Sequence, residues 1–179
     1  MTQLRIQLKR GRDARDVLVC IRSDGSRTWS PVHPFFPVHD LTHYAVECIL
    51  GFRTAFYGLI AGGWSIPDFA NRGSRYRMTE ETLWAEHIVG LLDRERARGE
   101  QQTAEEFNAA LELGLTGSSL PGFRPLTEAD LSAIRRRRDD LASRWATVGP
   151  GDMLEIEFPP DPEQPAPAPA SANGELSAP

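Results

Sequence analysis

The chain has 179 residues, with 25 acidic and 20 basic side chains and 40% hydrophobic residues. This composition is typical of a globular protein and excludes a fibrous or wholly disordered one. The formal net charge of −5 excludes a protein dedicated to binding nucleic acid. Because no run of 18 apolar residues occurs, we also expect no membrane partner.

The cysteines and the first residues bear on the cellular compartment. Cys20 and Cys48 lie in apolar runs and are expected to be buried thiols in a reducing environment. The first 16 residues alternate apolar and charged side chains and lack the apolar core of a signal peptide. We therefore expect a cytoplasmic protein, and the strong preference for Arg over Lys indicates a GC-rich bacterial genome.

Three strands are predicted near the beginning of the chain, over residues 3–9, 16–22 and 27–30. Asp24-Gly25 lies between the second and third of them and is a strong hairpin signal. A further alternating segment, residues 153–158, predicts a C-terminal strand that rejoins the first strands. The sequence therefore predicts an α+β fold, with a small antiparallel sheet packed against about four to five helices.

Five helical segments are expected between the third and the last strand. Thr79 is a candidate N-cap, and Thr127-x-x-Asp130 is a variant of the capping box. Arg135–Arg138 forms the only basic run, and we expect exposed pairs with the acids one helical turn later, Asp139 and Asp140. The expected helices cover residues 38–50, 53–61, 79–98, 103–113 and 127–147.

The end of the chain differs in composition from the rest. Seven of the 14 prolines fall in residues 159–179, which contain a single large apolar side chain, Leu176. Such a segment buries too little apolar surface to offset its ordering entropy. We expect one globular domain over residues 1–158 and a disordered Pro/Ala-rich tail over residues 159–179.

Residues 38–50 carry four polar side chains that share one stripe of the predicted helix. At about 100° per residue, His39, His43 and Glu47 lie at about 0°, 40° and 80°, and Asp40 lies at about 100°. Most of the remaining circumference is apolar, which is typical of a buried helix. The polar stripe is therefore expected to face the protein interior.

Buried carboxylates need a compensating positive charge. The segment from Thr28 to Phe52 contains no Lys or Arg, and a His-x-x-x-His pair on one helical face is a metal clamp. The sequence thus predicts a divalent metal, most simply zinc. Its predicted ligands are His39 and His43, with Glu47 or His87 as the third, and His87 requires the 79–98 helix to pack on the first one.

The segment His39-Asp40-Leu41-Thr42-His43 resembles two known motifs. It is similar to the HExxH motif of zinc metallohydrolases, in which a glutamate beside two histidine ligands is the general base; Asp40 takes that place here. It also resembles the HDxxH metal motif of a ubiquinone-biosynthesis family. That family has a further Glu twelve residues after the second His, where this chain has Ala55.

Two functional hypotheses follow from this helix. The first is a small metal-dependent hydrolase, with Asp40 as the catalytic base or as the group that orients a ligand. The second is a non-catalytic binding or interaction protein, in which the same His, Asp and Glu side chains form a buried polar network with Arg53 or Tyr57. A third hypothesis, intermediate between these two, is a structural domain that is stabilised by a metal.

Overall fold

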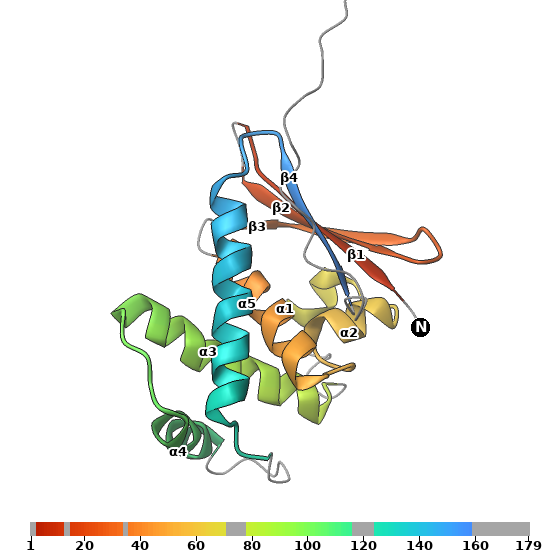
Figure 1. The fold of residues 1–179 in the computed structure, drawn as a ribbon. Coiled ribbons are helices and arrows are strands. Elements are labelled where there is room, and N and C mark those ends of the chain that lie inside the picture. Colours follow the sequence, from red (N-terminus) through yellow and green to blue (C-terminus); the bar gives the residue numbers. More distant parts are fainter. Residues whose placement is uncertain (1–2, 13–14, 34–35, 71–77, 116–123, 159–179) are drawn as a thin grey trace, which may run out of the picture.

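The computed structural model describes residues 3–12, 15–33, 36–70, 78–115 and 124–158. The protein has an α+β fold in which a four-stranded antiparallel sheet packs against helices. Figure 1 shows the helices gathered on one face of the sheet, with α4 farthest from it. The fold class expected from the sequence is confirmed.

The sheet joins the two ends of the described chain. Its strand order is β3-β2-β1-β4, and every neighbouring pair is antiparallel. Gly25 adopts a φ of +82° between β2 and β3, which a side chain would disfavour, so the Asp-Gly hairpin is confirmed. The strands are β1 (Leu4–Lys9), β2 (Asp16–Arg22), β3 (Arg27–Val32) and β4 (Met153–Phe158).

The helices follow the expected order, with shifted boundaries near the first two. The first begins two residues before the expected start, and the second covers only the last six residues of its expected range. They are α1 (Phe36–Leu50), α2 (Phe56–Ala61), α3 (Glu80–Arg98), α4 (Ala104–Leu115) and α5 (Glu128–Ala146), with the short 3-10 helix η1 (Ile66–Ala70) between α2 and α3.

Both predicted helix starts are capped as expected. The Thr79 hydroxyl accepts a hydrogen bond from the Thr82 N–H at the start of α3. Thr127 and Asp130 form a reciprocal capping box at the start of α5. These bonds satisfy N–H groups that have no partner within the helix, and they explain why α3 and α5 begin where they do.

Two apolar clusters form the core, and α1 belongs to both. Leu41 and Tyr44 pack into a cluster with the inward face of the sheet, α2 and the end of α5. Ala45 and Val46 pack into a second cluster with α3, α4 and the start of α5. As a result α1 is buried along most of its length, as its sequence pattern predicted.

The basic run of α5 is only partly exposed, so the expectation for Arg135 is wrong. Its guanidinium is buried and binds Glu95 of α3 through two hydrogen bonds of 3.1 and 2.6 Å. It also donates to the backbone carbonyl of Gln102. Arg138 is buried as well and contacts Asp139, its immediate neighbour. Arg135 pairs with Glu95, 40 residues away, because the fold buries the guanidinium beside that carboxylate and two hydrogen bonds join them.

Three further expectations concern thiols, membranes and the end of the chain. Cys20 and Cys48 are free thiols, the first buried and the second half-buried. Among the described helices, none is long and apolar enough to cross a bilayer. The predicted tail, residues 159–179, lies outside the described residues.

Candidate functional site

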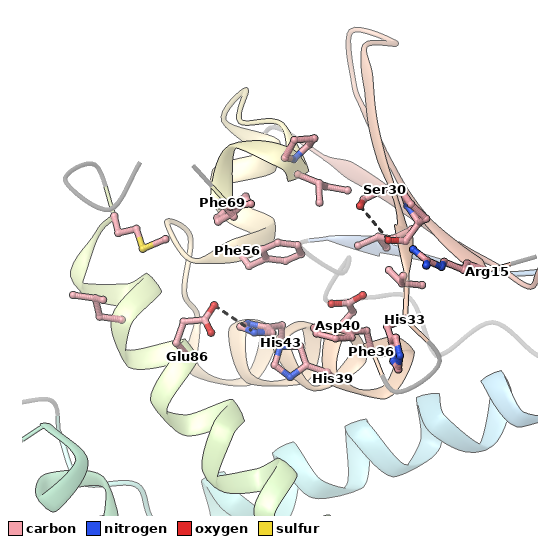
Figure 2. Close-up of a pocket in the computed structure, with 18 residues that line it drawn as sticks. Arg15, Ser30, His33, Phe36, His39, Asp40, His43, Phe56, Phe69 and Glu86 are labelled. Atoms are coloured by element: carbon pink, nitrogen blue, oxygen red, sulfur yellow. Dashed lines mark hydrogen bonds and ion pairs between the residues drawn. The ribbon is translucent and has the colours of Figure 1, made fainter. Parts of the chain in front are cut away.

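A cavity of about 880 Å³ lies between the sheet, η1 and the helices α1 and α3. Figure 2 shows His39, Asp40 and His43 along its α1 side and Glu86 at its α3 side. The remaining walls are mostly apolar. The lining residues from the sheet and its flanks are Arg15, Leu18, Ser30, Pro31, Val32 and His33; those from the helices and the segments next to them are Phe36, Phe56, Ile66, Pro67, Phe69, Ala70, Met78 and Leu83.

The two histidines of α1 lie next to each other and reach acids on α3. Their rings are edge to face, with centroids 4.8 Å apart. Nδ1 of His39 is 2.7 Å from Oδ2 of Asp93, and Nε2 of His43 is 3.7 Å from Oε1 of Glu86. Because α1 packs on α3, one helix supplies the imidazoles and the other supplies the carboxylates.

The environments of the two imidazoles move their pKa values in opposite directions. His43 is buried, and burial together with the nearby charge of His39 lowers its pKa to about 3. Burial also disfavours the charged form of His39, but the hydrogen bond and the charge of Asp93 raise its pKa overall. His43 is therefore neutral at neutral pH, as a metal ligand must be.

Asp40 lines the cavity beside the histidines and is itself buried. Burial raises its pKa to about 7, the charge of His39 opposes this shift, and the charges of Asp93 and Glu86 add to it. Five buried side-chain polar atoms of the described residues have no hydrogen-bond partner. Three of them belong to this cluster: Oδ2 of Asp40, Nδ1 of His43 and Oδ1 of Asp93. Such atoms are rare in folded proteins, so the hydrogen-bonding capacity that other described residues leave unused is concentrated in this cluster.

Glu47, a predicted metal ligand, lies on the same stripe but points to a different element. Its carboxylate accepts hydrogen bonds of 3.0 to 3.2 Å from the backbone N–H groups of Tyr57 and Gly58, at the start of α2. It is fully buried and is not among the residues that line the cavity. The predicted buried network with Tyr57 therefore describes this residue.

His87, the other predicted third ligand, is not brought to the cavity either. The predicted packing of α3 on α1 is confirmed, but the residues of α3 that reach the histidines are Glu86 and Asp93. His87 lies toward α4, where a Cβ added to Gly114 would be 3.6 Å from its Nδ1. Glu86 and Asp93 are seven residues apart, a spacing of two turns that places both on one helical face. The seven-residue spacing of these two acids is the sequence signal for the face of α3 that meets α1, and His87 is the residue next to Glu86.

The donor set suits zinc, although no metal centre is formed in the described part of the chain. Among the described residues, no three His, Cys, Asp or Glu side chains form a group that could hold a metal ion. Two ligands of tetrahedral zinc are about 3.4 Å apart when each bond is about 2.1 Å. The 3.7 Å between His43 and Glu86 is close to that value. The prediction of a metal thus stays a prediction, and neither predicted third ligand, Glu47 or His87, lines the cavity.

Comparison of the chain with protein-family models, curated proteins and solved structures finds no significant match. The chemistry of the cavity therefore carries the functional interpretation.

Proposed function

We propose that the cavity is the active site of a metal-dependent hydrolase that acts on a small molecule in the cytoplasm. The supporting observation is that His39 and His43 of α1 face Glu86 of α3 in the cavity, where His43 is neutral and 3.7 Å from the Glu86 carboxylate. Free Cys20 and Cys48 suit a reducing compartment.

The three side chains would hold one divalent ion, most simply zinc. Asp93 would orient His39, because a hydrogen bond at Nδ1 leaves Nε2 free as a ligand. Glu86 has a side chain that is 50% exposed, so it can change rotamer at little cost to close on the ion. When bound, the metal would acidify a water molecule and polarise the carbonyl under attack.

Asp40 would handle the proton of the hydrolytic step. Its carboxyl lies in the cavity next to His39, and its Oδ2 has no hydrogen-bond partner within the described residues. The hydroxyl of water adds to the acyl carbon, the bond to the leaving group breaks, and the proton of that water passes through Asp40 to the leaving group.

A second candidate is a non-catalytic small-molecule-binding protein. One observation in its favour is that His39 already forms a hydrogen bond with Asp93. Another is that the described ranges contain no three converging metal ligands. In this case the polar groups of the cavity would bind the ligand directly.

Metal content separates the two candidates. Protein purified without a histidine tag and dialysed against zinc should retain about one zinc ion per chain, measured by elemental analysis. His39→Gln, His43→Gln and Glu86→Gln should lose most of it, whereas His87→Gln, which changes a histidine outside the cavity, should retain it. Hydrolysis of 4-nitrophenyl butyrate should fall by about 100-fold in the first three variants.

Circular dichroism and a melting curve show whether each variant folds, which matters most for the buried His43. The half-exposed Glu86 can be replaced with little risk to the fold, so its variant decides if His43→Gln fails to fold. Wild-type protein that retains no zinc, or folded variants that retain as much zinc as wild type, would contradict the hydrolase and favour the second candidate.

A further inference from the structure

The cavity is polarised from one end to the other. Asp40 and Glu86 lie on its helical side, and Arg15, just before β2, lies on its sheet side (Figure 2). Arg15 is the only Lys or Arg among the lining residues of the described chain. Its side chain has no hydrogen bond or ion pair with any other described residue, although Asp16 follows it directly. A guanidinium beside a cavity is suited to a planar anion such as a carboxylate, which it binds through two parallel hydrogen bonds.

The middle of the cavity is apolar and aromatic. The ring of Phe56 lies 5.5 Å from that of His43 and 4.8 Å from that of Phe69, so an aromatic wall leads away from the histidines. Leu18 and Val32 contribute from the sheet. This surface favours an aromatic or branched aliphatic group over a sugar or a nucleotide, whose many hydroxyls would lose water here without finding partners.

The size of the cavity suits a small molecule. A volume of about 880 Å³ falls within the roughly 300–1,000 Å³ range of sites that enclose drug-sized ligands. Phe36, the first residue of α1, is exposed near His33. Its ring gives the opening of the cavity an apolar edge.

From this arrangement we propose that the cavity binds an amphiphilic anion, with an apolar body along Phe56 and Phe69 and one carboxylate or similar group on Arg15. The inference deepens the proposed hydrolase and rests on it for one point, that the susceptible bond lies at the His39–His43 end. The substrate would then be an ester or amide of an apolar acid that keeps a second, free anionic group.

Two dyes of matched shape test the anion site without any metal. 8-Anilinonaphthalene-1-sulfonate carries one negative charge, and N-phenyl-1-naphthylamine has the same ring skeleton without the sulfonate. Fluorescence titration of metal-free, full-length protein should show that Arg15→Gln weakens sulfonate-dye binding by about fivefold or more and neutral-dye binding by less than about twofold. Arg96→Gln, which removes the same charge from an exposed site on α3, should leave both affinities unchanged.

A cavity-filling variant shows where the dyes bind. Leu83 lines the cavity, and Leu83→Trp should weaken both dyes if they occupy it. Arg15→Gln affinities equal to wild type, equal losses for both dyes, or binding that Leu83→Trp leaves unaffected would overturn the inference.

An activity measurement separates this inference from the proposed function. Zinc-loaded wild type should cleave the mono-4-nitrophenyl ester of glutaric acid faster than 4-nitrophenyl butyrate, and Arg15→Gln should lose that preference. If neither ester is cleaved while the dyes still discriminate at Arg15, the hydrolase proposal fails and the anion site stands. If both esters are cleaved at equal rates and the dyes do not discriminate, the anion site fails and the hydrolase stands.

Discussion

A carboxyl group buried without a cation is costly, and Glu47 is the clearest case in this molecule. It is fully buried and accepts hydrogen bonds from the N–H groups that open α2, and no described Lys or Arg pairs with it. Burial raises its pKa to about 8, against the two backbone hydrogen bonds, and the charges of Glu81 and Glu86 add to the rise. The folded protein therefore favours the protonated form of Glu47.

This preference predicts a pH-dependent stability that Glu47→Gln removes. The folded pKa of about 8 lies above the ordinary value of about 4.5. The stabilisation that protonated Glu47 gives the folded state is therefore fully present below about pH 4.5 and is lost as pH rises through 8. Urea unfolding from pH 5 to 9 should show wild type losing stability relative to Glu47→Gln, by at most about 1.4 kcal/mol per pH unit.

The control for this experiment is Glu105→Gln, which changes an exposed acid of α4 and should follow the wild-type curve. Parallel curves for wild type and Glu47→Gln would show that Glu47 is ionised in the folded protein throughout the range.

At the scale of elements, the ion pair between Arg135 and Glu95 ties α5 to α3. Both side chains are buried, with exposed fractions of 8% and 3%, and Glu95 also accepts from the Gln102 N–H after α3 ends. Arg135 closes the same loop through the Gln102 carbonyl. One buried pair thus fixes two helices and the segment that leads into α4.

Breaking this pair from one side leaves a buried charge without a partner. We expect Glu95→Ala to lower the free energy of unfolding by about 3–5 kcal/mol, whereas Glu95→Leu combined with Arg135→Met should cost much less. Urea denaturation at pH 7 measures both. The exposed neighbour Arg136→Ala should change stability by less than about 0.5 kcal/mol. A loss for Glu95→Ala as small as that of Arg136→Ala would contradict the buried pair.

Features that are local in sequence were predictable at this scale, and contacts between distant segments were not. Thr79, Thr127 and the Asp24-Gly25 turn act within a few residues, and each forms as expected. Arg135 offered two kinds of partner, the acid four residues ahead and Glu95 on another helix. Only the tertiary arrangement that brings Glu95 of α3 to Arg135 of α5 decides between them, and no single-sequence pattern encodes it.

In the candidate site, too, the local pattern was predictable and the contacts between distant segments were not. The polar stripe of α1 identified His39, Asp40 and His43, which all line the cavity. Glu47 lies on the same stripe but does not line the cavity, because its carboxylate accepts hydrogen bonds from two backbone N–H groups at the start of α2. Which residues of α3 reach the histidines depends on the rotation of that helix about its own axis. A shift of one residue, about 100°, separates His87 from Glu86.

At the scale of the whole molecule, the last described strand completes the sheet that the first strands begin. Leu154, Ile156 and Phe158 of β4 are buried in the same cluster as β1 and α1. The expected division into a domain over residues 1–158 and a tail stays a prediction, which truncation can test.

A chain that ends at Phe158 should melt within about 2 °C of the full-length protein, because it keeps every described residue of both clusters. A chain that ends at Asp152 lacks β4 and three buried apolar side chains, so we expect it not to fold cooperatively. Differential scanning calorimetry of both would check this. A large loss of stability in the longer truncation would mean that residues 159–179 belong to the folding unit.

Helix α1 forms a wall of both apolar clusters and of the cavity, so the three share one structural element. An occupant of the cavity is then coupled to the unfolding of the entire domain. A ligand at one hundred times its dissociation constant would add about 2.7 kcal/mol to the free energy of unfolding. Melting temperature becomes a screen, in which a collection of small anions and divalent ions can be ranked without knowing the reaction beforehand.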